Sequence, residues 1–274
     1  MPCVRDILQT CGLDRIDAQV LLQHALGVSR SWLIAHDTDP LSHTDVDRVQ
    51  SLIQRRQAGE PVAYVVGERE FMGHVFRVTP AVLIPRPDTE CLVDAAIAEI
   101  ERCRTLRPAP RVLDLGTGSG AIAVSLALAC PDARVLATDL CADALVVAIG
   151  NAQRLGAGVE FHAGSWYHAL PSEAKFDLIV SNPPYIDVDD PHLQLGDLRH
   201  EPLQALTDGQ NGLTALSDII SQAPKWLETG GALWVEHGWQ QASAVRALLE
   251  QFGFTHVQSR KDLAGIERIS GGYL

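Results

Sequence analysis

The segment Asn182-Pro183-Pro184-Tyr185, directly after the apolar run 176–181, has the residue types and spacing that most clearly suggest chemistry. An Asn side chain offers one carbonyl acceptor and one amide donor group. The prolines fix their own φ at about −65° and bias the preceding residues toward extended geometry. The Asn182 side-chain oxygen and the Pro183 carbonyl can therefore form a rigid pair of acceptors, suited to a planar NH2 group beside the ring of Tyr185. A Pro-rich turn that ends a buried strand is the alternative interpretation.

A second candidate site is the glycine-rich run 114–120 at an expected strand-to-helix turn. Glycines permit positive φ and close approach of the backbone to a ligand. The start of the following helix offers free N–H groups to a polar or anionic group. Asp139 ends the next expected strand, where a carboxylate can accept both hydroxyls of a ribose. These features predict a cofactor with a nucleoside, bound by Gly116, Thr117, Gly118, Ser119, Gly120 and Asp139.

The glycine spacing is G-x-G-x-G rather than the G-x-G-x-x-G of dinucleotide-binding proteins. Asp114 lies inside the turn, where its carboxylate can hold an ammonium such as that of S-adenosylmethionine. The run resembles motif I of class I S-adenosylmethionine-dependent methyltransferases. In that family the acceptor motif lies at the end of the fourth strand, where residues 182–185 fall. The resemblance therefore implies that both motifs meet at the carboxyl ends of the strands.

Asn-Pro-Pro-Tyr occurs in several methyltransferase groups, among them DNA adenine, ribosomal RNA guanine and protein glutamine enzymes. Three further segments are similar to the bacterial peptide chain release factor glutamine methyltransferases: 59–71, Leu83-Ile84-Pro85-Arg86-Pro87-Asp88-Thr89-Glu90, and Glu236-His237-Gly238. The resemblance covers nearly the whole chain. It implies methyl transfer from S-adenosylmethionine to the side-chain amide nitrogen of the glutamine in the Gly-Gly-Gln motif of class 1 release factors. S-adenosylhomocysteine is then the product, and neither a metal, a membrane nor direct nucleic-acid contact is expected.

The resemblance also assigns roles to single residues. It makes 116–120 the cofactor loop, Asp139 the ribose acid, Trp166 the aromatic residue beside adenine, and 182–185 the glutamine-binding motif. Without the resemblance, Trp166 is more typical of a core residue. One departure is Ser165, because relatives commonly have Asp immediately before this Trp. A Ser hydroxyl would accept a hydrogen bond from the adenine amino group more weakly than a carboxylate.

An amide nitrogen is a poor nucleophile because its lone pair is delocalised into the carbonyl. We expect the Asn182 side-chain oxygen and the Pro183 carbonyl to accept its two hydrogens and orient the lone pair for in-line displacement. Tyr185 would pack against the amide, and Pro184 would complete the substrate site. Positioning and preorganised dipoles then supply most of the acceleration. No strong base is needed, since the methylated amide can lose its proton afterwards.

The hydrophobic pattern predicts the elements that must hold these residues. The first sixty residues have helical spacing, and Gly27 is placed as a helix stop. Residues 62–67 and 71–78 have the composition of short strands. After them, expected helices over 120–130 and 142–155 alternate with expected strands over 111–115, 134–138, 159–162, 176–181 and 232–236. A final pair, 254–259 and 267–271, is expected to add an antiparallel edge.

This alternation predicts an α/β fold of the class I methyltransferase type, with a doubly wound and mainly parallel sheet. We expect three parts: a helical substrate-recognition domain over 1–60, a β-hairpin linker over 61–88, and an S-adenosylmethionine-binding catalytic domain over 89–274. The role of the first part rests on the resemblance.

The composition is typical of a soluble globular protein, with 46% hydrophobic and 20% charged residues in 274. No apolar run approaches the roughly 20 residues of a membrane helix, and no signal peptide is recognisable, so a cytoplasmic protein is expected. Six cysteines and ten histidines show no metal-ligand spacing. A net charge of −12 disfavours a broad phosphate-binding surface. Four arginines close in sequence form either a local basic patch or a solvated helix end: Arg102, Arg104, Arg107 and Arg111.

Three other functions were weighed. A nucleic-acid methyltransferase acting on adenine or guanine is the main alternative, because the same acceptors suit any exocyclic NH2; the net charge and the helical first domain disfavour it. An NAD-dependent oxidoreductase has no use for the motif at 182–185. A non-catalytic binding module leaves both motifs unexplained. Near the site, Arg86, Asp88 and Glu90 either border the cofactor pocket or stabilise the junction between domains, and His237 is expected to be packed rather than catalytic.

Overall fold

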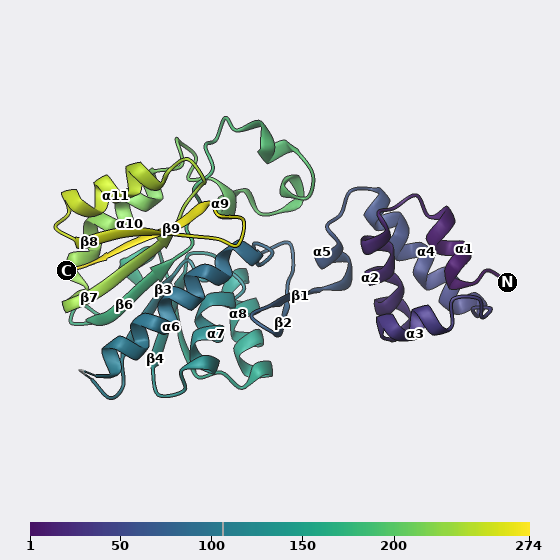
Figure 1. The fold of residues 1–274 in the computed structure, drawn as a ribbon, viewed down its shortest axis with the longest axis horizontal. Helices are drawn as coiled ribbons and strands as arrows, with labels where there is room; N and C mark the ends of the chain where they lie inside the picture. Colours follow the sequence, from purple (N-terminus) through teal and green to yellow (C-terminus); the bar gives the residue numbers. More distant parts are fainter. Residues whose placement is uncertain (106) are drawn as a thin grey trace. The chain divides into compact units, whose positions relative to one another are not determined.

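Five short helices build the first of two compact units, which comprises Met1–Glu68. The computed structural model describes residues 1–105 and 107–274. The helices are α1 (Val4–Thr10), α2 (Arg15–Leu26), α3 (Arg30–Ala35), α4 (His43–Gln57) and α5 (Val62–Val66) (Figure 1). The Asp14 side chain accepts from the Ile16 N–H at the start of α2, and Gly27 ends it with φ +66°. Helices this short are marginal alone, so their apolar faces pack into one core around Leu21, Leu22 and Val49.

The strand expected over 62–67 is wrong, because this segment forms helix α5. Pro61 precedes the helix with φ −56°, and Gly67 ends it in the left-handed conformation at φ +77°. Val65 is buried in the helical core. Packing on neighbouring helices therefore outweighs the preference of its β-branched residues for strands. The hairpin lies one step later, in β1 (Glu68–Phe71) and β2 (His74–Arg77).

The second unit, Arg69–Leu274, contains a seven-stranded sheet in the order β5-β4-β3-β6-β7-β9-β8. Its strands are β3 (Arg111–Leu115), β4 (Arg134–Asp139), β5 (Val159–Ala163), β6 (Phe176–Ser181), β7 (Leu227–Glu236), β8 (Thr255–Lys261) and β9 (Glu267–Tyr273). The pairs among β3 to β7 are parallel, whereas β9 runs antiparallel to both β7 and β8. The predicted fold class is thus confirmed. The expected division at 1–60, 61–88 and 89–274 stays a prediction; the boundary between the two units falls at Glu68, inside the expected linker.

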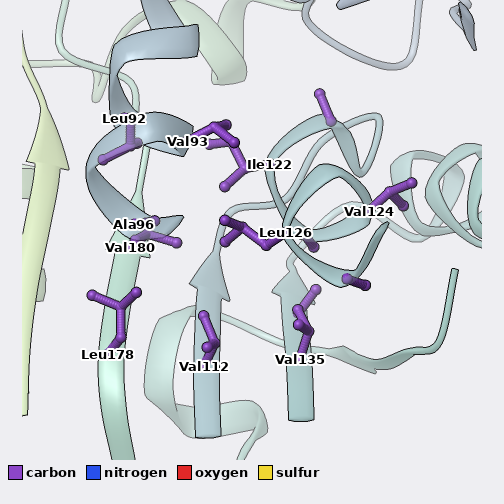
Figure 2. Close-up of a cluster of buried hydrophobic side chains, with 14 of the residues drawn as sticks. Leu92, Val93, Ala96, Val112, Ile122, Val124, Leu126, Val135, Leu178 and Val180 are labelled. Carbon is purple, nitrogen blue, oxygen red and sulfur yellow. The ribbon is translucent and has the colours of Figure 1, made fainter. Parts of the chain in front are cut away.

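Alternating residues of the central strands face two helical layers. Helices α6 (Glu90–Arg104), α7 (Ala121–Ala129) and α8 (Ala142–Leu155) cover one face, where Figure 2 shows Val112 and Leu178 beneath side chains of α6 and α7. Helices α10 (Thr214–Gln222) and α11 (Ala242–Gln251) cover the other, against Leu113, Ile179 and Leu233. Burial on both faces explains why these strands are nearly continuous apolar runs.

Shorter elements occupy the loops at the strand ends: η1 (Pro87–Thr89), η2 (Trp166–Ala169), η3 (Pro191–Gln194), η4 (Leu198–His200), α9 (Leu203–Leu206) and η5 (Ala223–Lys225). Within the described residues, no helix is both long and apolar enough to cross a membrane.

The clustered arginines make specific contacts with neighbouring side chains. Arg102 pairs with Glu99 at 2.7 Å, and Arg107 pairs with Glu228 at 3.0 Å. Arg104 pairs with Asp132 and Glu101, and the guanidinium of Arg111 lies 5.4 Å from the ring centroid of Phe176. These contacts favour the helix-end interpretation over a basic patch.

Candidate active site

The register of the sheet brings four functional segments to one edge. Leu115 of β3 pairs with Thr138 of β4 on one side and with Ser181 of β6 on the other. Ser181 in turn pairs with Val235 of β7. The residues that follow these pairs are Gly116, Asp139, Asn182 and Glu236, so motifs far apart in the sequence leave the sheet side by side. This edge is where ligands bind in open α/β sheets.

A cavity at this edge contains most of the expected cofactor residues. Gly116, Thr117, Gly118, Ser119, Asp139, Trp166 and Asn182 all line it, together with Ser165 and Pro184. Four expected site residues, Asp114, Gly120, Pro183 and Tyr185, are not among the lining residues. Each of them adjoins a lining residue in sequence or contacts one: Pro183 lies between Asn182 and Pro184, Tyr185 follows Pro184, Gly120 follows Ser119, and Asp114 accepts from Thr117.

The loop after β3 needs its glycines for two separate reasons. Gly116, Gly118 and Gly120 have φ of +73°, +56° and +81°, which side chains rarely adopt. A Cβ at Gly120 would also lie 3.2 Å from the backbone of Ala148 in α8, and one at Gly116 would lie 3.1 Å from the ring of Trp166. The loop is therefore shaped by backbone conformation and by close packing on both sides.

Asp139 ties this loop to the end of β4. Its Oδ2 accepts from the Gly118 N–H and its Oδ1 from the Cys141 N–H, both at 2.8 Å. Burial raises the pKa of Asp139 above its ordinary value, while these backbone donors lower it. The carboxylate thus faces the cavity with its orientation fixed by main-chain hydrogen bonds.

Asp114 is fully buried beneath the loop. Its Oδ2 accepts from the Thr117 hydroxyl at 2.6 Å, and the Ala123 N–H also lowers its pKa, although no described residue meets its Oδ1 at ordinary hydrogen-bond geometry. Desolvation raises the pKa of Asp114 to about 7. Asp114 does not line the cavity, and its contact with the cofactor loop is the hydrogen bond from Thr117, which does line it.

Trp166 enters the cavity from an unusual backbone conformation. It has φ +45°, and it follows Gly164, which has φ +154°. Positive φ is rare for an aromatic residue, and such outliers gather at functional sites. Its ring lies over Gly116. Ser165, where the sequence departs from the relatives' Asp, also lines the cavity.

Asn182 and Tyr185 are held by buried groups on other elements. The Asn182 Nδ2 donates to the Thr89 Oγ1 at 3.1 Å, and the Tyr185 hydroxyl donates to the Glu236 Oε1 at 3.0 Å. The Tyr185 carbonyl accepts from the Gln241 Nε2 at 3.0 Å. Both ends of the motif are therefore anchored by side chains distant in sequence.

Glu236 and His237 at the end of β7 are both buried. Desolvation raises the pKa of Glu236 to about 7, which the Thr89 and Tyr185 hydroxyls partly counter. The His237 Nδ1 contacts the Gly238 carbonyl at 3.0 Å, and its Nε2 contacts the Ser270 hydroxyl at 2.8 Å. Because a carbonyl only accepts, Nδ1 carries the proton and Nε2 accepts from Ser270. With burial lowering its pKa, His237 is a packed, neutral residue, as the sequence predicted.

Arg86 borders the cavity, and the carboxylate it pairs with belongs to the same unit, so a role at the junction between domains stays a prediction. That carboxylate is the buried Glu201, which also accepts from the Ile84 N–H at 3.0 Å. Asp88 instead pairs with Arg268 at 3.3 Å, and the Glu90 Oε1 accepts from the Met72 N–H at 2.9 Å. Neither of these two carboxylates is a lining residue.

Several lining residues were not predicted from the sequence. They are Phe71, Ala81, Val82, Leu83, Pro85, Thr89, Ala121, Ile122, Leu140, Cys141, Ala144, Gly164, Gln204 and Ala205. The family-like segment 83–90 was a signal for some of them, but apolar residues beyond strand ends carry no pattern of their own. Among the described residues, no group of three or more His, Cys, Asp or Glu side chains is arranged to hold a metal.

Comparison with known protein families matches residues 4–67 to the PrmC N-terminal domain and residues 106–266 to a methyltransferase domain. A release factor glutamine methyltransferase of Bordetella pertussis is 60% identical over 100% of both chains. Proteins with the same name are 50% identical in Burkholderia pseudomallei (98% of this chain, 95% of the relative) and 42% identical in Escherichia coli (97% and 94%).

Solved structures share the fold at low sequence identity. A methyltransferase from Pyrococcus furiosus has a TM-score of 0.54 and 20% identity, over 82% of this chain and 96% of its own. The 16S rRNA N2 G1207 methyltransferase of T. thermophilus, solved with AdoMet and guanosine, also has a TM-score of 0.54, with 19% identity over 75% and 49% of the two chains. At such identities the likeness concerns the fold alone.

Proposed function

This chain belongs to the release factor glutamine methyltransferase family, and we propose that its cavity binds S-adenosylmethionine beside the glutamine side chain of a release factor. It is a methyltransferase that modifies a protein glutamine. One observation carries the assignment of the site: Asn182 lines the same cavity as Gly116–Ser119 and Asp139. The acceptor motif and the cofactor motif therefore open into one space.

The residues of the cavity fit the cofactor. The glycines at 116 and 118 line the cavity without a side chain, and Asp139 presents a carboxylate with the chemistry that accepts ribose hydroxyls. As in the family, we assign Asp114, which accepts from Thr117, to the ammonium group, and Trp166 and Ser165 to the adenine. When bound, S-adenosylmethionine supplies an electrophilic methyl group on a sulfonium.

Asn182 and Pro183 position the glutamine amide. Because the Asn182 Nδ2 donates to Thr89, its Oδ1 is the atom that accepts one amide hydrogen, and the Pro183 carbonyl accepts the other. The nitrogen lone pair then faces the methyl donor, and the Tyr185 ring packs against the amide. With the cofactor bound, its methyl group would pass to the amide nitrogen as the bond to sulfur breaks, and the nitrogen would then lose one proton to water. Orientation supplies the acceleration without a strong base.

We assign recognition of the release factor to the helical unit, which matches the PrmC N-terminal domain. Because release factors act on ribosomes, we place the enzyme in the cytoplasm.

The test is methyl transfer in vitro. The purified protein is incubated with tritiated S-adenosylmethionine and with release factor, RNA or DNA. We expect label in the release factor only, with mass spectrometry placing one methyl group on the Gly-Gly-Gln glutamine. Label in nucleic acid but not in release factor would contradict the proposal and favour an exocyclic-amine substrate.

A further inference from the structure

An asparagine carboxamide can face a site with either its oxygen or its NH2 group, and only one of these suits an NH2 substrate. In this structure the Nδ2 of Asn182 donates to the Thr89 Oγ1 at 3.1 Å. The NH2 end is thereby occupied on the side of Thr89, which is 5% exposed and lines the cavity. The remaining acceptor, Oδ1, is left for the substrate.

A threonine hydroxyl can donate as well as accept, so Thr89 alone does not fix the direction of this hydrogen bond. Glu236 supplies the direction. Glu236 is 1% exposed and its Oε1 accepts from Tyr185, while Thr89 is the other hydroxyl that acts on its carboxyl group, so Oε2 is the oxygen left for the Thr89 proton. In its ionised form, which its pKa of about 7 makes the main form above that pH, the Glu236 carboxylate only accepts. The Thr89 proton therefore turns toward Glu236, and the Thr89 oxygen is left to accept from Asn182.

The same carboxyl group also holds the other end of the motif, because Glu236 Oε1 accepts from the Tyr185 hydroxyl at 3.0 Å. The register explains the arrangement: Ser181 of β6 pairs with Val235 of β7, so Asn182 and Glu236 leave neighbouring strands at the same level. One buried carboxylate thus reaches both Tyr185, directly, and Asn182, through Thr89.

We propose that Thr89 and Glu236 are positioning residues that fix the Asn182 carboxamide with its oxygen toward the substrate amide. The inference rests on the proposed function, and it assigns to Thr89 in the segment 83–90 a task that neither sequence motif carries. The two residues act through Asn182 rather than on the reacting atoms.

The test compares kcat for Thr89→Val, which keeps the shape but loses the hydroxyl, with Thr89→Ser, which keeps the hydroxyl. We expect Thr89→Val to lower kcat by about 10- to 100-fold, the range for losing one preorganised hydrogen bond to a charged network. The Kd for S-adenosylmethionine should change by less than about threefold, and Thr89→Ser should keep kcat within about threefold of the wild type. Thr105→Val, at an exposed helix end, is the matched control and should leave kcat unchanged.

Glu236→Gln should lower kcat to a similar extent. The NH2 group of the new glutamine can donate to the Thr89 hydroxyl, which would then donate to Asn182 instead of accepting from it. The double variant Thr89→Val/Glu236→Gln should lose little more than either single variant, since both act through Asn182. Multiplicative losses, or a Thr89→Val enzyme with near-normal kcat, would overturn the inference. If Glu236→Gln does not fold, the kcat values of Thr89→Val and Thr89→Ser are sufficient to test the positioning role.

Wild-type activity on release factor tests the proposed function separately. Each ratio of variant to wild-type kcat is measured with the amine substrate that the wild type methylates. A wild type active on release factor with a normal Thr89→Val variant would therefore refute only the positioning role.

Discussion

The two halves of the active-site edge are built in different ways. At the ends of β3 and β4, the cavity is shaped by main chain: glycines at positive φ and backbone N–H groups that orient Asp139. At the ends of β6 and β7, Asn182 and Tyr185 are held by buried side chains. The cofactor half is therefore encoded over a few adjacent residues, whereas the acceptor half depends on contacts across 93 and 51 positions of sequence.

The largest expected effect is a loss of turnover in the acceptor half that leaves cofactor binding by the other half unchanged. We expect Asn182→Ala to lower kcat by about 10²- to 10³-fold, because the substrate amide loses an oriented acceptor. The Kd for S-adenosylmethionine, measured by calorimetry, should stay within about threefold, since the loop after β3 is held independently. Asn211→Ala, at an exposed loop position, is the control. A parallel loss of cofactor affinity would mean that the halves are not independent.

The second prediction concerns how the buried Asp114 in the cofactor half makes the stability of the protein depend on pH. Its folded-state pKa of about 7 lies above the ordinary value of 3.8, so the stability that depends on its protonated form is complete below about pH 4 and is lost as the pH rises to 7. Asp114→Asn removes this loss. The free energy of unfolding of the variant, relative to wild type, should rise by on the order of 4 kcal/mol across this interval. Urea titrations at several pH values measure it, and a pH-independent difference would contradict it.

A smaller effect is expected from Asp139→Asn. The amide NH2 cannot accept from the Gly118 or Cys141 N–H groups, so one end of the loop is released. We expect affinity for S-adenosylmethionine to fall by about 10- to 100-fold. Turnover at saturating cofactor should fall far less than in Asn182→Ala. Asp143→Asn, exposed on the first turn of α8, should bind the cofactor as the wild type does.

The smallest effect concerns backbone shape. Gly120→Ala places a methyl group 3.2 Å from Ala148 at a φ of +81°, and it should destabilise the protein by about 1–3 kcal/mol. Gly150→Ala is the matched control, because it lies on the same helix as Ala148 with no atom within 4 Å of its added Cβ. It should stabilise the protein by about 0.5–1 kcal/mol. Equal effects of the two substitutions, measured by denaturant unfolding, would show that glycine there is not required by conformation.

The sequence predicts the sheet well because its strands are short apolar runs with clear ends. The expected strand 176–181 and helix 142–155 coincide with β6 and α8. The prediction of a strand over 62–67 is wrong, because these β-branched residues form α5, where neighbouring helices bury Val65. Local propensity contains no information about such neighbours.

The same distinction applies to the site. Glycine spacing locates a loop because the glycines are required where they stand, and the residues 116–119 do line the cavity. Their roles in binding, with those of Asp114 and Tyr185, stay predictions that the substitutions above address. The sequence marks Thr89 only as part of a family-like segment, because its pairing with Asn182 depends on how η1 and β6 meet.

Gly116 and Trp166 occupy a shared space, and this has a consequence for how related chains can diverge. A larger residue at 116 must adopt φ +73° and also displace the ring that lies 3.1 Å from its Cβ position. A smaller residue at 166 would relieve only the second constraint. A substitution at either position alone is therefore expected to destabilise the loop. In related enzymes we expect residues 116 and 166 to be substituted together or not at all.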